Sequence, residues 1–261
     1  MRKSITALVL IDLAFILLLS LSGAEGFFGI LLYLLAFILP MTAGLLFASK
    51  NGDVKAFLVK KERILPSFAL FAPALLAIIG ISAASTYLLT LLGKNNLTDV
   101  SGDLWLSLLR HALLPALLEE MLFRFLPMRL LADRSPRAVM LVSPILFALI
   151  HLNLFQIPYA LFAGGVLAFI TLATGSLLPA ILLHLANNAM SVIWLRNPEL
   201  ATPIIITVSL LCAVSLVCIF IRRREYAAWI KEAFSGERVE FYPELAVAAA
   251  LLLTAAIFNL R

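Results

Sequence analysis

Runs of about 20 apolar residues recur along nearly the whole chain and constrain its fold more than any other feature. Wound as an α-helix, such a run is long enough to cross a hydrocarbon core of about 30 Å. Hydrophobic residues make up 63% of the chain and charged residues only 13%, which lies outside the usual composition of soluble domains. The sequence therefore predicts an all-α fold, a polytopic transmembrane helical bundle of about eight or nine helices.

The apolar segments leave no room for a soluble domain, so residues 1–261 are predicted to form a single integral membrane domain. The segment 138–152 is short for a full crossing and is expected to tilt little or to end inside the protein. The predicted segments run approximately over residues 5–22, 27–48, 66–92, 104–131, 138–152, 157–173, 177–195, 203–221 and 243–260.

Basic residues gather in alternate loops, which is an orientation signal rather than a sign of nucleic-acid binding. Fifteen of the 20 Lys and Arg lie at Arg2 and Lys3 or within 50–63, 129–137 and 222–238. These regions are expected to be cytoplasmic loops, which places the N-terminus inside. The first segment is interpreted as a retained helix of a multi-pass protein, in a cell membrane of prokaryotic type.

Polar side chains inside the apolar segments are the candidates for chemistry, because an ionisable group is costly to keep in a membrane. Glu120 and Arg124 are four residues apart, so on a helix they can form an ion pair. Glu119 projects about 100° away and has no such partner, which favours it as general base. A purely structural clamp between Glu120 and Arg124 is the alternative. The predicted catalytic residues are Glu119, Glu120, Arg124, His151, His184 and Asn188.

His151 and Glu119 are equally distant from the polar turn 133–137, so a hairpin there brings them to the same depth. His184 and Asn188 share a helical face and offer two donors that suit an oxyanion. Asn187 lies off that face and is interpreted as an interhelical hydrogen-bonding residue.

Three other features have a simpler explanation. His111 stands near the start of its segment and is interpreted as interfacial, whereas the pair 164–165 of glycines suits close helix packing. Cys212 and Cys218 show no metal-binding spacing and are interpreted as packing residues. The chemistry must therefore come from the polar set described above.

Three motifs appear in a fixed order: Glu-Glu-x-x-x-Arg at 119–124, Phe-x-x-x-His at 147–151 and His-x-x-x-Asn at 184–188. Together with the stretch 174–179 they resemble the CPBP family, over about residues 105–195. That family includes the type II CAAX prenyl endopeptidases and proteins associated with bacteriocin immunity. Each motif alone is weak evidence of membership, but the ordered three are specific.

The resemblance implies an intramembrane endopeptidase in which Glu119 and His151 activate water while His184 and Asn188 stabilise the oxyanion. No cofactor is then required. Zinc is the alternative, since two His and one Glu suit that ion, and its ligands would be Glu119, His151 and His184. His151 is the preferred proton donor to the leaving amine, because an imidazole can donate at neutral pH.

The implied partner is a peptide or membrane-anchored protein substrate within the lipid bilayer, with prenylation of the substrate left open. The main alternative is a non-catalytic member, either a membrane scaffold or a bacteriocin self-immunity protein. A proton-coupled transporter would also bury Glu and His, but the sequence shows no inverted repeat of the usual kind.

Overall fold

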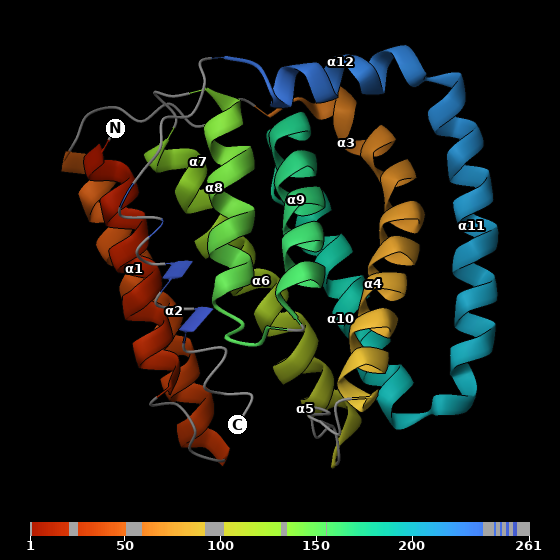
Figure 1. Cartoon of the computed structure of the whole chain (residues 1–261), viewed down its shortest axis with the longest axis horizontal. Coiled ribbons are helices and arrows are strands. Elements are labelled where there is room, and N and C mark those ends of the chain that lie inside the picture. Colours follow the sequence, from red (N-terminus) through yellow and green to blue (C-terminus); the bar gives the residue numbers. More distant parts are fainter. Residues whose placement is uncertain are drawn as a thin grey trace.

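The structure is a computed structural model that describes residues 2–20, 26–50, 59–91, 102–131, 135–154 and 156–236, with a few single positions between 243 and 254. Every regular element in this part of the chain is helical, which confirms the predicted all-α fold. The long helices stand side by side in a bundle, and their connections lie at its two ends (Figure 1).

The helices follow the predicted segments closely. The main ones are α1 (Arg2–Ser20), α2 (Gly26–Lys50), α3 (Lys61–Ser67), α4 (Phe71–Leu91), α5 (Leu104–Leu108), α6 (Leu114–Glu120), α7 (Leu126–Leu130), α8 (Pro136–Leu149), α9 (Ile157–Thr174), α10 (Leu178–Arg196), α11 (Ala201–Ile221) and α12 (Arg223–Ala233). The predicted span 243–260 lies outside the described residues apart from those single positions.

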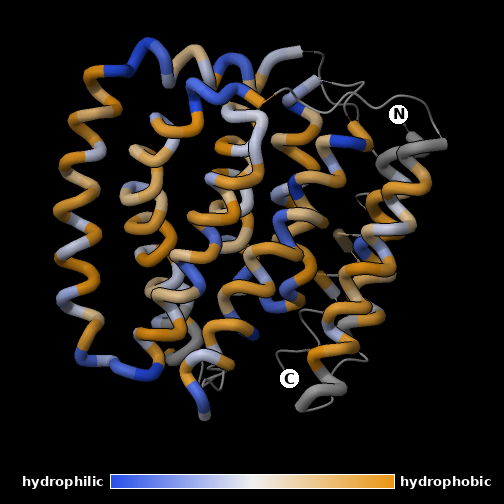
Figure 2. The backbone as a smooth tube through the Cα atoms, turned by 180° about the vertical axis from the view of Figure 1, so that it is seen from behind, coloured by the Kyte–Doolittle hydropathy of each residue, from blue (hydrophilic) through white to orange (hydrophobic). Residues whose placement is uncertain are grey.

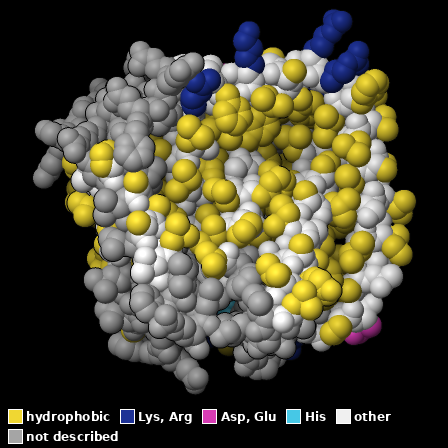
Figure 3. Space-filling model, in the orientation of Figure 1, with side chains coloured by type: hydrophobic (Ala, Val, Ile, Leu, Met, Phe, Trp, Pro, Cys, Tyr) yellow, Lys and Arg dark blue, Asp and Glu magenta, His cyan; other side chains and the backbone are white. Residues whose placement is uncertain are grey.

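Within the described part, five helices are long and apolar enough to cross a membrane. The tube in Figure 2 is hydrophobic along the long helices and hydrophilic at the two ends of the bundle. In Figure 3, Lys and Arg side chains stand along one edge, above a broad hydrophobic face. This distribution is that of an integral membrane protein. The five stretches are Ile30–Phe47, Lys61–Ser85, Ile157–Thr174, Leu178–Arg196 and Pro198–Ile221.

The predicted span 104–131 is one rod broken by two π-helical turns, η2 (Leu109–Leu113) and η3 (Met121–Phe125). Each π turn is followed within two residues by a proline, Pro115 in α6 and Pro127 in α7. Proline has no N–H to continue the i to i−4 ladder, which explains why the helix is irregular at these places. Widened turns of this kind are frequent at functional sites, and here they flank the two glutamates.

The side chain of Ser143 compensates for one of these prolines. Pro127 cannot donate to the carbonyl of Phe123 four residues earlier, and the hydroxyl of Ser143 on α8 donates to that carbonyl instead. Ser143 is fully buried, so the bond is shielded from water and lipid. The hydrogen bond therefore ties α8 to the irregular helix next to the site.

The main core lies between α1, α2, α7, α8 and α9, where aromatic rings interlock. The rings of Phe15 and Phe123 are 6.0 Å apart, and those of Phe123 and Phe147 are 5.8 Å apart. At the contact of α8 with α9, a Cβ on Gly164 would lie 3.2 Å from the backbone of Pro144. Gly164 thus permits the close helix packing that the sequence predicted.

The helix α12 was not predicted, because its charged residues suggested a loop. It lies across the end of the bundle, and its apolar side buries Tyr226, Trp229 and Ala233 (Figure 1). Charged residues on a short amphipathic helix face away from the core and so resemble a loop in composition. The prediction of a loop over the whole of 222–238 was therefore wrong.

Ion pairs connect α12 to the start of α3 and the residue before it. Glu232 accepts hydrogen bonds from Lys60 and from Arg63, the latter at 2.7 Å. Partial burial alone would raise the pKa of Glu232, but the hydrogen bonds from Lys60 and Arg63 outweigh it and lower the pKa below its usual value. The guanidinium of Arg63 also lies 5.4 Å from the ring centre of Trp229.

Candidate active site

Glu120 and Arg124 form the buried base of the site. Arg124 Nη1 lies 3.2 Å from Glu120 Oε1, and both side chains are completely inaccessible. The guanidinium also stacks on Phe147, 4.2 Å from the ring centre, and Nη2 lies 3.5 Å from the carbonyl of Gly164. The structure thus contains the ion pair that the i, i+4 spacing predicts. Three helices, α6, α8 and α9, supply the groups that hold the arginine in place.

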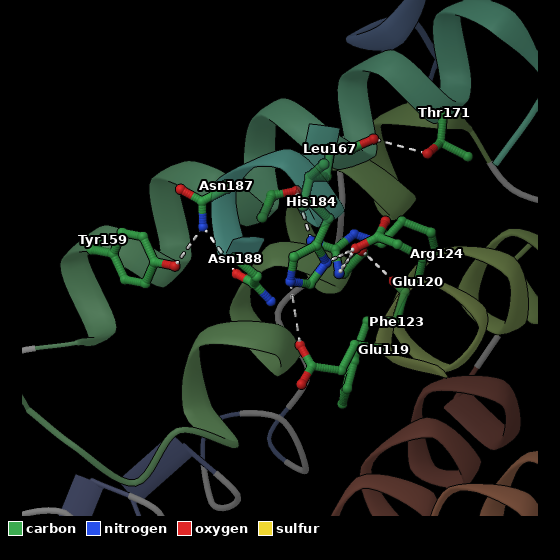
Figure 4. Close-up of polar contacts among 12 residues, drawn as sticks. Glu119, Glu120, Phe123, Arg124, Tyr159, Leu167, Thr171, His184, Asn187 and Asn188 are labelled. Atoms are coloured by element: carbon green, nitrogen blue, oxygen red, sulfur yellow. Dashed lines mark hydrogen bonds and ion pairs between the residues drawn. The ribbon is translucent and has the colours of Figure 1, made fainter. Parts of the chain in front are cut away.

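His184 on α10 stands between the two glutamates (Figure 4). Its Nδ1 is 2.8 Å from Glu120 Oε1, while its Nε2 is 3.8 Å from Glu119 Oε2. A carboxylate ion-paired with Arg124 accepts hydrogen bonds, so Nδ1 carries the hydrogen of this bond. The remaining nitrogen, Nε2, therefore points towards Glu119. The motifs at 119–124 and 184–188 meet at this imidazole, although the sequence did not predict the bond to Glu120.

His151 is held in a similar way at the end of α8. Its Nδ1 lies 2.9 Å from the carbonyl of Phe147, which leaves Nε2 without a bond to the backbone. The Phe147 ring packs edge-on against both imidazoles, 5.1 Å from His151 and 5.8 Å from His184. Because α8 ends at Leu149, His151 lies in the bend that follows and not on a regular helix. The short predicted segment therefore ends within the protein.

The two asparagines on α10 differ in their surroundings. Asn187 is buried and donates to the hydroxyl of Tyr159 on α9 at 3.2 Å and to Asn188 Oδ1 at 3.0 Å. It thus connects α9 with α10, as the sequence predicted. Asn188 lines a cavity together with His184. Oδ1 of Asn188 accepts the hydrogen bond from Asn187, so the NH2 group of Asn188 is not used in that bond.

A cavity of about 330 Å³ brings the candidate groups together. Glu119, His151, His184 and Asn188 line it, whereas Glu120 and Arg124 do not. Sequence reasoning missed several other lining residues, since a tyrosine or arginine near a membrane surface is common. His111, interpreted as interfacial, also lines the cavity, which it shares with Ile30, Tyr33, Arg110, Leu114, Pro115, Phe147 and Tyr159.

The alternative of a zinc site needs three ligands that can converge. Among the described residues, no group of three His, Cys, Asp or Glu side chains lies close enough to hold a metal ion. Glu119, His151 and His184 therefore do not fit a three-ligand site in this arrangement. Both imidazoles do present Nε2 while Nδ1 is bonded to oxygen, an orientation that metal-binding histidines share.

These features define a helical membrane protein whose carboxylates and imidazoles meet in a cavity within the bundle. Residues 101–190 match the family model of the type II CAAX prenyl endopeptidase, Rce1-like. The match covers the motif-bearing third of the chain and supports the resemblance to the CPBP family that the ordered motifs indicate. No curated protein and no solved structure matches the chain.

Proposed function

We propose that the protein is an endopeptidase in which Glu119 activates a water molecule for attack on a peptide carbonyl. The observation that carries this proposal is the position of Glu119 in the cavity, 3.8 Å from His184 Nε2, while Glu120 is engaged by Arg124 and His184. Glu119 therefore presents its carboxylate to the cavity, where a substrate can reach it. General bases of this kind need a position within hydrogen-bond reach of the water.

His184 and Asn188 are the proposed oxyanion donors. Glu120 accepts from Nδ1 of His184 and so fixes the ring with Nε2 towards the cavity. In the proposed role His184 is an imidazolium, which carries a hydrogen on Nε2 as well and can donate it to the oxyanion. Donors that are held in place before the reaction stabilise the developing charge without reorganisation. Glu120 and Arg124 are fully buried and cannot contact a substrate. They therefore act as positioning residues: Glu120 orients His184, and Arg124 holds Glu120.

The proposed reaction proceeds through a tetrahedral intermediate. Glu119 takes one proton from water as the oxygen bonds to the carbonyl carbon, and the carbonyl oxygen becomes the oxyanion. The C–N bond then breaks while His151, which enters the cycle as an imidazolium with a proton on Nε2, donates that proton to the amine nitrogen. The proton held by Glu119 returns to His151 and restores both groups. Each step uses side chains of the cavity.

The match of residues 101–190 to the CAAX endopeptidase family model supports the protease over the alternatives, namely a scaffold or self-immunity protein. The discriminating experiment is cleavage of a peptide library by the purified protein, with and without a chelator. We compare the wild type with Glu119→Gln, His184→Ala and Asn188→Ala. Ser191→Ala is the matched control, since Ser191 lies on the same helix, is exposed and does not line the cavity.

Loss of cleavage in the cavity variants, with activity retained in Ser191→Ala and in chelator, supports glutamate-activated water. Inhibition by chelator that zinc reverses would instead support a metal enzyme. A folded wild type that cleaves no substrate, with or without added zinc, would contradict the protease proposal and favour the scaffold. A prenylated and an unprenylated form of each peptide determine whether the lipid group is required.

A further inference from the structure

The buried side chain of Asn187 holds two residues that line the cavity. Its amide nitrogen donates to the hydroxyl of Tyr159 on α9 at 3.2 Å and to Oδ1 of Asn188 at 3.0 Å. Tyr159 and Asn188 line the cavity, whereas Asn187 does not. A single amide nitrogen behind the cavity wall therefore fixes two polar side chains of that wall (Figure 4).

The hydroxyl of Tyr159 has a hydrogen that its bond with Asn187 does not use. A phenol can donate one hydrogen bond and accept others, and here its oxygen accepts from Asn187. In the part of the chain that the structure describes, no protein group accepts a hydrogen bond from this hydroxyl. The proposed reaction also gives it no role. The hydrogen is therefore available to a molecule that occupies the cavity.

The place of this hydroxyl relates it to the proposed oxyanion donors. Asn188 accepts from the same nitrogen of Asn187 as Tyr159 does, so the two side chains approach each other from α10 and α9. His184 lies one turn before Asn188 on the same face of α10. In Figure 4, Asn188 stands between Tyr159 and His184. The donors of two helices thus form one group on the cavity wall.

We infer that Tyr159 is a third hydrogen-bond donor to the oxyanion of the tetrahedral intermediate and that Asn187 positions it together with Asn188. This role rests on the proposed function. As the carbonyl oxygen gains negative charge, the hydroxyl donates a hydrogen bond to it and keeps its proton. A donor that is fixed before the reaction stabilises such charge without reorganisation. The alternative is a bond that only joins α9 to α10, and such a bond is indifferent to the charge of a ligand.

The test uses a phosphinic peptide, in which a tetrahedral anion replaces the peptide bond, built on the library peptide that the protein binds most tightly. Tyr159→Phe removes the hydroxyl and keeps the ring. We expect this variant to bind the phosphinic peptide about 10- to 100-fold more weakly and to lose a similar factor in kcat. Its Kd for the ordinary, planar peptide, measured in a Glu119→Gln background, should stay within about twofold, which also shows that it is folded. Tyr87→Phe is the matched control, since Tyr87 is exposed and does not line the cavity.

The positioning role of Asn187 is tested by coupling. Asn187→Ala should also weaken binding of the phosphinic peptide more than that of the planar peptide. Tyr159→Phe should then cost less in the Asn187→Ala background than in the wild type, because the hydroxyl is no longer held in place. Costs that simply add would overturn the positioning role.

Equal affinity of the wild type and Tyr159→Phe for the phosphinic peptide would overturn the inference and leave the proposed protease standing if the wild type cleaves. Equal weakening for the planar and the phosphinic peptide would also overturn it, in favour of a bond that only joins two helices. A wild type that binds the phosphinic peptide through Tyr159 but cleaves no peptide would contradict the protease and support the donor. A folded wild type that binds neither compound would overturn both.

Discussion

Nδ1 of His184 lies 2.8 Å from Oε1 of Glu120, so a fully buried carboxylate orients an imidazole whose other nitrogen faces the cavity. The same carboxylate is paired with Arg124. Glu120 thereby links the first and third motifs through a single oxygen. The adjacent Glu119, unlike Glu120, lines the cavity.

Replacing Glu120 by Gln is expected to lower kcat by about 10- to 10³-fold, as does loss of a group that orients a catalytic histidine. An amide can present either its oxygen or its nitrogen to Nδ1, so the hydrogen on the ring is no longer fixed. Steady-state kinetics of the purified variant measure this effect. A fall in kcat without a matching rise in KM is the expected signature, and unchanged kcat would contradict the orienting role.

Replacing Ser143 by Ala is expected to reduce the free energy of unfolding by about 1–3 kcal/mol, because the buried carbonyl of Phe123 loses its donor. The control is the same substitution in a Pro127→Ala background. An alanine in place of the proline restores a backbone N–H that can donate to Phe123, so Ser143→Ala should cost less there. Unfolding titrations of the four proteins give the coupling directly. Equal costs in both backgrounds would show that Pro127 is not the reason for this bond.

The adjacent glycines of α9 provide a matched pair. A Cβ on Gly164 would lie 3.0 Å from Phe147 Cδ1 and 3.2 Å from Pro144 Cα, whereas a Cβ on Gly165 would have no neighbour within 4 Å. Gly164→Ala is expected to destabilise the protein by about 1–3 kcal/mol through overpacking. Gly165→Ala should be neutral or stabilise it by up to about 1 kcal/mol, since alanine favours the helix. Thermal denaturation in detergent measures both. Equal effects would contradict the close contact of α8 with α9.

The contact of α12 with the start of α3 should depend on pH. The pKa of Glu232 is lowered in the folded protein, so this carboxylate contributes stability that is fully present above its unfolded pKa of about 4.3. The contribution is lost as the pH falls through the lower, folded value. Fluorescence of Trp229, in a variant with Trp105→Phe and Trp194→Phe, should report release of α12 in this acid range. Glu232→Gln is the control and should show no such step. A step that persists in it would assign the change to another group.

The sequence by itself determined the helical class, the membrane location and most helix positions. In lipid the backbone must satisfy its own hydrogen bonds, and an apolar run of about 20 residues does so as a helix. It also determined local pairs on one helix, such as Glu120 with Arg124, because a spacing of four residues fixes their proximity. The candidate catalytic residues were found from the cost of polar groups in apolar segments and from the ordered motifs.

Only the tertiary structure decided which groups meet across helices. The bond of His184 to Glu120 depends on the depth of α10 relative to the helix that carries Glu120. The number of residues between the two helices in the sequence does not determine that depth. The place of Arg110 in the cavity, and the donation from Ser143 to Phe123, likewise depend on how helices pack around two prolines. The helix α12 was missed because its stability comes from burying Trp229 against the bundle, which is a tertiary contact.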